Sequence, residues 1–143
     1  MQPTGPGEPV TAESGRRWRV FVVDNNVDLA RTLAEVIGFE PDLESAGYSC
    51  EGNDALARAT AAGADVLVLD FSLPGRNALA ILDEARAAGS GLRILVFTGY
   101  ASPELAKECS ARGAAGYVVK GGDFEELARA IRRAVPSTDA DGA

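Results

Sequence analysis

Short apolar runs alternate with stretches of helical periodicity along most of the chain. Residues 19–23 are rich in β-branched side chains and predict a strand. Apolar positions then recur at helical spacing over residues 27–37, which predicts a helix. A weaker strand is expected around residues 43–46, where glycine and polar residues surround the apolar positions, and a second helix is expected around residues 55–59.

The middle of the chain carries the clearest strand. Residues 66–69 are continuously apolar, which is typical of a strand buried on both faces of a parallel sheet. A helix over residues 78–85 and a strand over residues 94–97 follow. The next helix is expected to begin at residues 102–104, because serine, proline and glutamate there supply an N-cap, a first-turn proline and an early acid.

The same alternation ends with a strand over residues 117–119 and a last helix. Asp123 and Glu126 resemble a capping box, and apolar residues form a stripe from Phe124 to Val135. Five repeats of strand and helix, joined by right-handed crossovers, predict an α/β three-layer sandwich with a five-stranded parallel sheet in the middle.

The chain ends differ in composition from this alternating region. Residues 1–15 hold prolines, glycines and small polar side chains, so they are expected to form a disordered tail, as are residues 136–143. A single domain over residues 16–135 accounts for the rest, because 143 residues leave no room for a second domain of ordinary size.

Charge and hydropathy narrow the possible partners. The net charge is −7 and no dense run of lysine and arginine occurs, so nucleic-acid binding by this domain is not expected. No apolar stretch approaches the roughly 20 residues that a membrane helix needs. The first residues lack the apolar segment of a secretory signal, and a cytoplasmic location is therefore expected.

The chain contains no histidine, which limits the chemistry available to it. Catalytic triads with a histidine base and imidazole-ligated metal sites are excluded. Cys50 and Cys109 have no metal-type spacing and are expected to be small buried hydrophobic residues. Any chemistry must therefore come from carboxylates, hydroxyls, amines or the backbone.

Four predicted strands are followed by a polar residue: Asp24, Asp70, Thr98 and Lys120. Each has an ordinary structural explanation, since an aspartate can cap the next helix, a threonine hydroxyl can be satisfied locally and a lysine can be solvated. Together they indicate more. The carboxyl ends of parallel strands share one edge of the sheet, which is where ligands bind in open α/β folds.

Two carboxylates with a nearby ammonium suit a hard divalent cation and a phosphoryl group. Magnesium prefers one or two carboxylates together with phosphate oxygens and water. A carboxylate can itself act as the nucleophile and form an aspartyl phosphate. In that arrangement Lys120 and Thr98 would bind the oxygens of the new phosphoryl group.

Several short motifs occur in a fixed order and cover about residues 19–135. They are residues 22–26 (Val-Val-Asp-Asn-Asn), 66–70 (Val-Leu-Val-Leu-Asp), 73–75 (Leu-Pro-Gly), 96–100 (Val-Phe-Thr-Gly-Tyr) and 116–120 (Gly-Tyr-Val-Val-Lys). In this order and spacing the set resembles the signatures of response-regulator receiver domains of two-component signalling. The resemblance implies a flavodoxin-like fold with strand order 2-1-3-4-5.

The resemblance also implies roles at the predicted rim. Asp70 would take a phosphoryl group from a histidine kinase or a histidine phosphotransfer protein. Asp24 and Asp70, helped by the backbone carbonyl of Ser72, would hold Mg²⁺. Lys120 would pair with Asp70 or with the phosphoryl group. The domain would then be a signalling domain rather than an enzyme, because it assists only its own phosphoryl transfer and dephosphorylation.

Switching residues are implied in the same way. Thr98 would move toward the phosphoryl group, Tyr117 would turn inward behind it, and Gly99 would keep access open. The face made of the fourth helix, fifth strand and fifth helix would bind an output protein or a second copy. Residues 40–43 look most like receivers that precede a helix-turn-helix domain, so both a stand-alone receiver and part of a larger regulator stay open.

Three positions depart from the family pattern. Asn25 stands where receivers have a second acid that contacts magnesium, and it could offer only a neutral oxygen or help to cap the next helix. A unit charge about 4 Å from the cation is worth about 4 kcal/mol per charge pair at an effective dielectric of roughly 20, so weaker metal binding is expected. Asn77 replaces an aspartate and can still cap a helix. Gly121 replaces a proline and should loosen the loop that follows Lys120.

Three functional hypotheses follow. The first is a phosphorylation switch at Asp70. The second is a phosphorylation-independent interaction module with a weakened metal site, which Asn25 and Gly121 favour. The third is a cofactor binder such as a flavin carrier, but Asp24 and its neighbours stand where a glycine-rich phosphate loop would be needed.

Overall fold

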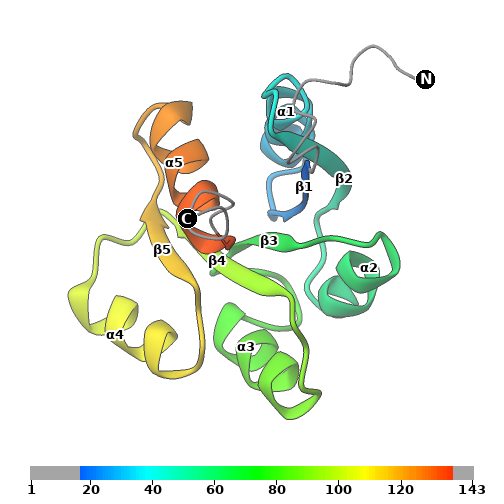
Figure 1. The fold of residues 1–143 in the computed structure, drawn as a ribbon. Helices are drawn as coiled ribbons and strands as arrows, with labels where there is room; N and C mark the ends of the chain where they lie inside the picture. The colour runs from blue at the N-terminus through cyan, green and yellow to red at the C-terminus, as the bar shows by residue number, and fades with distance from the viewer. Residues whose placement is uncertain (1–16, 137–143) are drawn as a thin grey trace.

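The computed structural model describes residues 17–136, in which five strands alternate with five helices (Figure 1). The expected tail at residues 1–15 lies outside the described residues, as does the tail beyond Pro136. The strands are β1 Trp18–Val23, β2 Leu43–Ser49, β3 Val66–Asp70, β4 Arg93–Thr98 and β5 Gly116–Val119. The helices are α1 Val27–Ile37, α2 Ala55–Ala61, α3 Ala78–Ala87, α4 Pro103–Ala111 and α5 Phe124–Ala134.

All five strands are parallel and lie in the order β2-β1-β3-β4-β5, which confirms the predicted architecture. Helices α1 and α5 cover one face of the sheet, and α2, α3 and α4 cover the other (Figure 1). Each face has its own apolar core. Every residue of β3 is buried, because this strand lies in the middle of the sheet with helices on both sides.

Strand β2 is longer than the sequence predicts, since it reaches Ser49 rather than residue 46. Its register against β1 shifts between Val20 and Phe21, where a β-bulge is inserted. Gly47 occupies the shifted position with φ +116°, a backbone conformation that favours glycine. Pairing with β1 resumes after the bulge and extends β2 through Tyr48 and Ser49.

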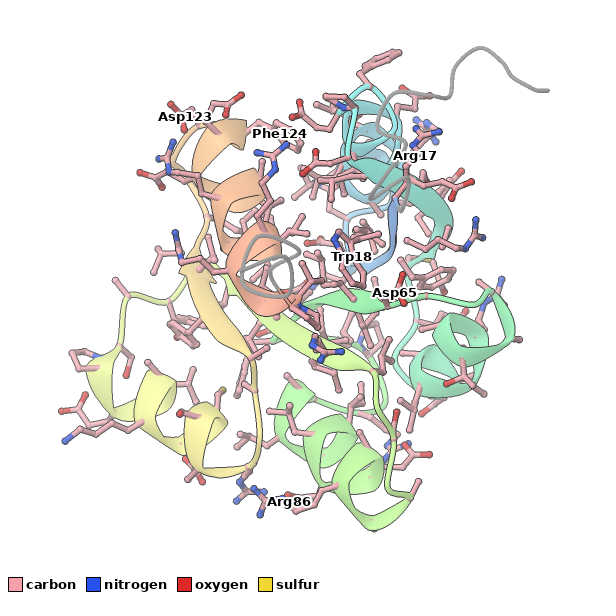
Figure 2. The ribbon with its side chains drawn as sticks, viewed as in Figure 1. Arg17, Trp18, Asp65, Arg86, Asp123 and Phe124 are labelled. Atoms are coloured by element: carbon pink, nitrogen blue, oxygen red, sulfur yellow. The ribbon has the colours of Figure 1, made fainter. Side chains whose placement is uncertain are left out.

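The predicted helix caps are formed by side chains that accept backbone hydrogen bonds. Asn77 accepts from Ala80 at the start of α3, and Ser102 accepts from Leu105 at the start of α4. Asp123 accepts from Glu126 at the start of α5, where Figure 2 shows Asp123 beside Phe124. The later elements are connected as well, because the guanidinium of Arg86 donates to the Ala111 carbonyl at 2.7 Å and ties α3 to α4.

The cysteines differ in their surroundings. Cys109 is a fully buried residue of α4, and burial raises the pKa of its thiol, so it packs as a neutral side chain. Cys50 is only half-buried. Within residues 17–136 we find no helix with the length and apolar character that crossing a membrane requires.

Candidate functional site

The ammonium group of Lys120 lies between two buried carboxylates at the carboxyl edge of the sheet. It is 2.8 Å from Asp24 Oδ2 and 3.5 Å from Asp70 Oδ1. Asp24 is 1% exposed and Asp70 is 4% exposed. Two carboxylates and one ammonium therefore share a largely buried site with a formal net charge of about −1, which favours the binding of a cation.

Asp24 follows β1 and turns into the loop before α1. Its Oδ1 accepts a hydrogen bond from the Asn26 amide at 2.9 Å. Its Oδ2 is fully buried and forms an ion pair with the Lys120 ammonium at 2.8 Å, in a geometry that does not make a hydrogen bond. A buried carboxylate oxygen of this kind can still accept a bond or a metal ion.

Asp70 is the last residue of β3, next to β1 in the sheet. Its Oδ1 accepts from the Ser72 amide at 3.3 Å, and its Oδ2 accepts from the Asn25 amide at 3.2 Å. The loops after β1 and β3 thus both turn an amide toward this carboxylate. These backbone donors, together with Lys120, fix the direction of the Asp70 side chain.

Asn25 does not cap α1, so the alternative that it serves as a helix cap is wrong. The cap is the next residue, Asn26, whose side chain accepts from the Leu29 amide at 3.1 Å. Asn25 instead donates its side-chain amide to the Ser72 carbonyl at 2.6 Å. This is the carbonyl expected to contact magnesium. The side-chain amide of Asn25 thus links the loop after β1 to the loop after β3, which the sequence pattern does not reveal.

Thr98 and Lys120 complete the rim from the other side of β3. Thr98 ends β4 and is 1% exposed, and its Oγ1 accepts from the Tyr100 amide at 3.2 Å. The Lys120 amide donates to the Thr98 carbonyl at 2.7 Å, so the two residues are joined through the backbone. The Lys120 ammonium also lies 5.5 Å from the centre of the Phe97 ring. Phe97 is a part of the site that the sequence-based search missed.

Tyr117 lies on β5, with its hydroxyl donating to the Tyr100 carbonyl at 2.7 Å. Burial raises the pKa of Tyr117, which keeps the hydroxyl protonated as a donor throughout the neutral range. The Tyr100 ring meets Phe71 edge to face, with 6.5 Å between the ring centres. Phe71 directly follows Asp70, so one ring contact and one hydrogen bond, both through Tyr100, connect the end of β3 to β5.

Replacing Tyr117 with phenylalanine removes this hydrogen bond and keeps the ring. We expect Tyr117→Phe to lower the free energy of unfolding in urea by about 1 kcal/mol, because the bond is partly exposed. Tyr100→Phe is the matched control, since it retains the carbonyl that accepts the bond. Equal stabilities of wild type and Tyr117→Phe would mean that this hydrogen bond does not stabilise the fold.

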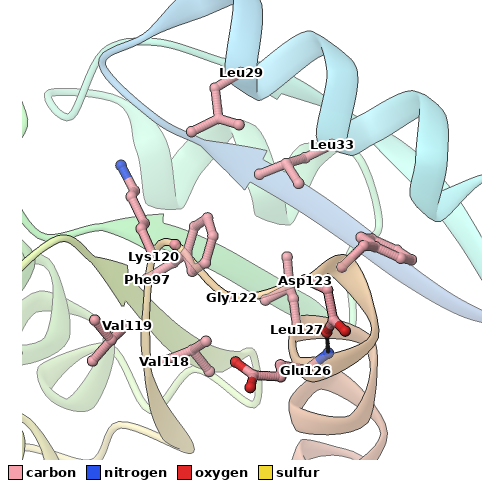
Figure 3. Close-up of a pocket in the computed structure, with 12 residues that line it drawn as sticks. Leu29, Leu33, Phe97, Val118, Val119, Lys120, Gly122, Asp123, Glu126 and Leu127 are labelled. Carbon is pink, nitrogen blue, oxygen red and sulfur yellow. Dashed lines mark hydrogen bonds between the residues drawn. The ribbon is translucent and has the colours of Figure 1, made fainter.

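The loop after β5 borders a small apolar cavity of about 200 Å³ between α1, β4 and α5 (Figure 3). Lys120 forms one wall with its ammonium turned away from α5, and Leu29 and Leu33 form another. Gly121 in this loop has φ +108°, which the fixed ring of a proline cannot adopt. A Cβ atom built on Gly99 would meet no described heavy atom within 4 Å, so there is open space beside that residue.

Few carboxylate side chains lie at the rim. Within residues 17–136, no group of three or more histidine, cysteine, aspartate or glutamate side chains is placed to hold a metal ion. Asp24 and Asp70 are the carboxylates at the rim, and Asn25 stands where a third would be. The site therefore offers a cation fewer charged ligands than the usual receiver pattern implies.

The sequence profile of the response regulator receiver domain matches residues 20–132. The chain is 37% identical over 114 residues to the DNA-binding transcriptional activator DevR/DosR of Mycobacterium tuberculosis, which covers 80% of the chain and 52% of that protein. It is 29% identical over 115 residues to the nitrate/nitrite response regulator NarL of Escherichia coli, covering 80% and 53%. The chain thus spans about half the length of these relatives.

Solved structures agree in fold. The receiver domain of a NarL response regulator from M. tuberculosis superposes with a TM-score of 0.76 at 22% identity, covering 81% of this chain and 94% of that one. CheY in a complex with CheX, BeF3 and Mg²⁺ from Borrelia burgdorferi gives 0.74 at 19% identity, with coverage of 83% and 90%. From the profile match and these relatives, the chain belongs to the response regulator receiver domain family.

Proposed function

We propose that this domain accepts a phosphoryl group on Asp70 from a histidine kinase or a histidine phosphotransfer protein. One observation carries the proposal: a lysine ammonium lies within 3.5 Å of two buried carboxylates at the carboxyl edge of the sheet. Such a site combines a nucleophile with a cation that stabilises the charge of an incoming phosphoryl group. The family membership supports the same role.

The chemical step is a displacement at phosphorus. An Asp70 oxygen attacks the phosphorus of a phosphohistidine, a P–O bond forms, and the P–N bond breaks with its electron pair going to the imidazole nitrogen. The products are an acyl phosphate on Asp70 and a histidine that takes up a proton. These 143 residues contain no histidine, so the donor histidine lies outside them.

After transfer, the new group brings up to about two negative charges to the rim. Lys120 would then pair with the phosphoryl oxygens, and the Thr98 hydroxyl, which now accepts from the Tyr100 amide, would turn to donate to them. Loss of the Thr98 bond frees the loop that Tyr117 also holds. The roles of Tyr117 and Gly99 in switching are predictions of this proposal.

Magnesium would supply further neutralisation of charge when bound. The residues present fit it in part: Asp24 and Asp70 are buried carboxylates, Asp24 Oδ2 lacks a hydrogen bond, and the Ser72 carbonyl lies within hydrogen-bond distance of the loop after β1. Asn25 would add a neutral oxygen at most. We therefore propose weak binding of Mg²⁺.

The output surface in this proposal is the face made of α4, β5 and α5, which would bind a partner protein or a second copy. Val119 on β5 is 37% exposed, and Arg129 and Arg133 line a hollow beside it. The net charge of −7 gives no reason to propose nucleic-acid binding by the domain itself.

The proposal is tested by incubating the protein with a small phosphodonor and Mg²⁺ and measuring its intact mass. Wild type is expected to gain one phosphoryl group, and Asp70→Asn none, because an amide cannot form the acyl phosphate. Asp83→Asn, which alters an exposed aspartate on α3, should label like wild type. An unlabelled wild type beside a labelled control receiver, or equal labelling of Asp70→Asn, would contradict the proposal.

A second candidate is a phosphorylation-independent interaction module, which the bond between Asn25 and the Ser72 carbonyl favours. A module of this kind would keep one conformation whatever the phosphodonor does. Backbone amide NMR shifts along α4, β5 and α5 should then stay the same with and without phosphodonor. Shifts in those elements that are lost in Asp70→Asn would reject this candidate.

A further inference from the structure

The hydrogen bond between Asn25 and Ser72 joins the loop after β1 to the loop after β3. Its length of 2.6 Å fixes which end of the side chain faces the carbonyl, because a flipped amide would place two oxygens at that distance. The Nδ2 atom therefore faces Ser72, and the Oδ1 atom faces away from it. The bond is exposed, whereas the carboxylates of Asp24 and Asp70 are buried.

This orientation opposes magnesium coordination by the same groups. The Ser72 carbonyl oxygen has a second lone pair, but a cation bound there would lie beside the positively polarised N–H group of Asn25 and would repel it. Asn25 could offer Oδ1 to such a cation only after its side chain rotates and the bond to Ser72 breaks. Coordination by Asn25 thus requires the bond to open, and coordination by Ser72 is disfavoured while the bond is made.

The other ligand atoms are also engaged within the chain. Asp24 Oδ2 faces Lys120, Asp70 Oδ1 accepts from the Ser72 amide, and Asp70 Oδ2 accepts from the Asn25 amide. Asn25 therefore uses its backbone to hold the acceptor carboxylate and its side chain to hold the neighbouring loop. Asn25 alone thus makes hydrogen bonds to both Asp70 and Ser72.

An aspartate at position 25 would behave in the opposite way. Its carboxylate could not donate to the Ser72 carbonyl, so two oxygens would face each other and repel unless a cation lay between them. A third negative charge would also join Asp24 and Asp70, which only Lys120 balances. In that arrangement the cation becomes the link between the loops, as the amide is here.

We propose that, before phosphorylation, the Asn25 side-chain amide links the loops after β1 and β3, a role that a divalent cation would otherwise fill. Cation binding must then compete with the bond to Ser72. Asn25 is then a positioning residue that makes the arrangement of the rim nearly independent of Mg²⁺. This claim does not rest on the proposed phosphorylation of Asp70, since it concerns the two loops before any transfer.

The test measures thermal unfolding of wild type, Asn25→Asp and Asn25→Ala in EDTA and in millimolar MgCl2. Wild type should have nearly the same Tm in both, because the bond is already made. Asn25→Asp should unfold earlier in EDTA and gain several degrees with Mg²⁺, with binding by calorimetry about tenfold tighter than wild type or more. Asn25→Ala should lose stability in both, since it has neither the bond nor the added charge.

Asn77→Asp is the matched control, because it makes the same change at the cap of α3, outside the rim, and should respond to Mg²⁺ like wild type. A second readout needs no variant. The Asn25 side-chain amide of wild type should give a distinct NMR signal that millimolar MgCl2 leaves in place.

The proposal is overturned if Mg²⁺ raises the Tm of wild type as much as that of Asn25→Asp, or if low concentrations of MgCl2 shift the Asn25 amide signal to saturation. These measurements use no phosphodonor. They therefore stand whether or not Asp70 becomes phosphorylated, and a failure of the functional proposal is seen separately in the mass experiment.

Discussion

Lys120→Met is expected to lower the free energy of unfolding by about 3 kcal/mol at neutral pH without divalent cations. Methionine keeps the unbranched stem that packs beside Phe97, so the change removes mainly the ammonium. Asp24 and Asp70 would be left as buried like charges without the cation between them. Urea unfolding followed by far-UV circular dichroism measures the loss.

The chain supplies a control for this experiment, because its only other lysine is Lys107 on the exposed side of α4. Lys107→Met should change stability by less than about 0.5 kcal/mol. A second variant identifies the cause. Asp24→Asn added to Lys120→Met should restore part of the stability, since it removes one of the two repelling charges. If the double variant is no more stable than Lys120→Met alone, repulsion between the carboxylates is not the source of the loss.

Much of this site could be predicted from the sequence because it depends on strand ends. The apolar run before Asp70 marks a central strand, and parallel strands bring Asp24 and Lys120 to the same edge. Such placement follows from topology alone. The structure puts the ammonium within 3.5 Å of both carboxylates, as the geometric prediction requires.

The contacts that loops make could not be predicted in this way. Asn25 and Asn26 are adjacent and identical, yet one caps α1 and the other bonds to a loop 47 residues away. Their roles differ because the turn after β1 points them in different directions, which no periodicity records. The extent of β2 was also missed, since a bulge at Ala46, next to Gly47, lets a polar and glycine-containing segment continue the sheet.

A second charged cluster lies away from the rim and was not foreseen. Arg132 near the end of α5 donates from Nε and Nη2 to both carboxylate oxygens of Asp42, at 2.8 and 2.9 Å. It also donates to Glu40 at 2.6 Å. The two acids belong to the turn between α1 and β2. The cluster therefore ties the last helix of the domain to its first helix and edge strand.

Arg132→Met is expected to lower the free energy of unfolding by about 1–2 kcal/mol at neutral pH. The bidentate geometry favours a real contribution, and the 34% exposure of the Arg132 side chain limits it. Arg31→Met removes a more exposed ion pair, with Asp28, and should cost about 0.5 kcal/mol or less. Equal effects of the two substitutions in urea unfolding would show that the Arg132 cluster is an ordinary surface pair.

Acid should reduce the difference between wild type and Arg132→Met. The hydrogen bonds from Arg132 lower the pKa of Asp42 in the folded protein below its ordinary value of about 4. A carboxyl group with a lowered pKa stabilises the fold above its unfolded pKa, and this contribution disappears as pH falls through the folded value. Because other carboxylates titrate in both proteins, the difference between them isolates the Arg132 cluster. It should be constant from about pH 5 to 8 and shrink below about pH 4. A difference that stays the same in acid would mean that Arg132 stabilises the domain through packing of its stem and not through Asp42.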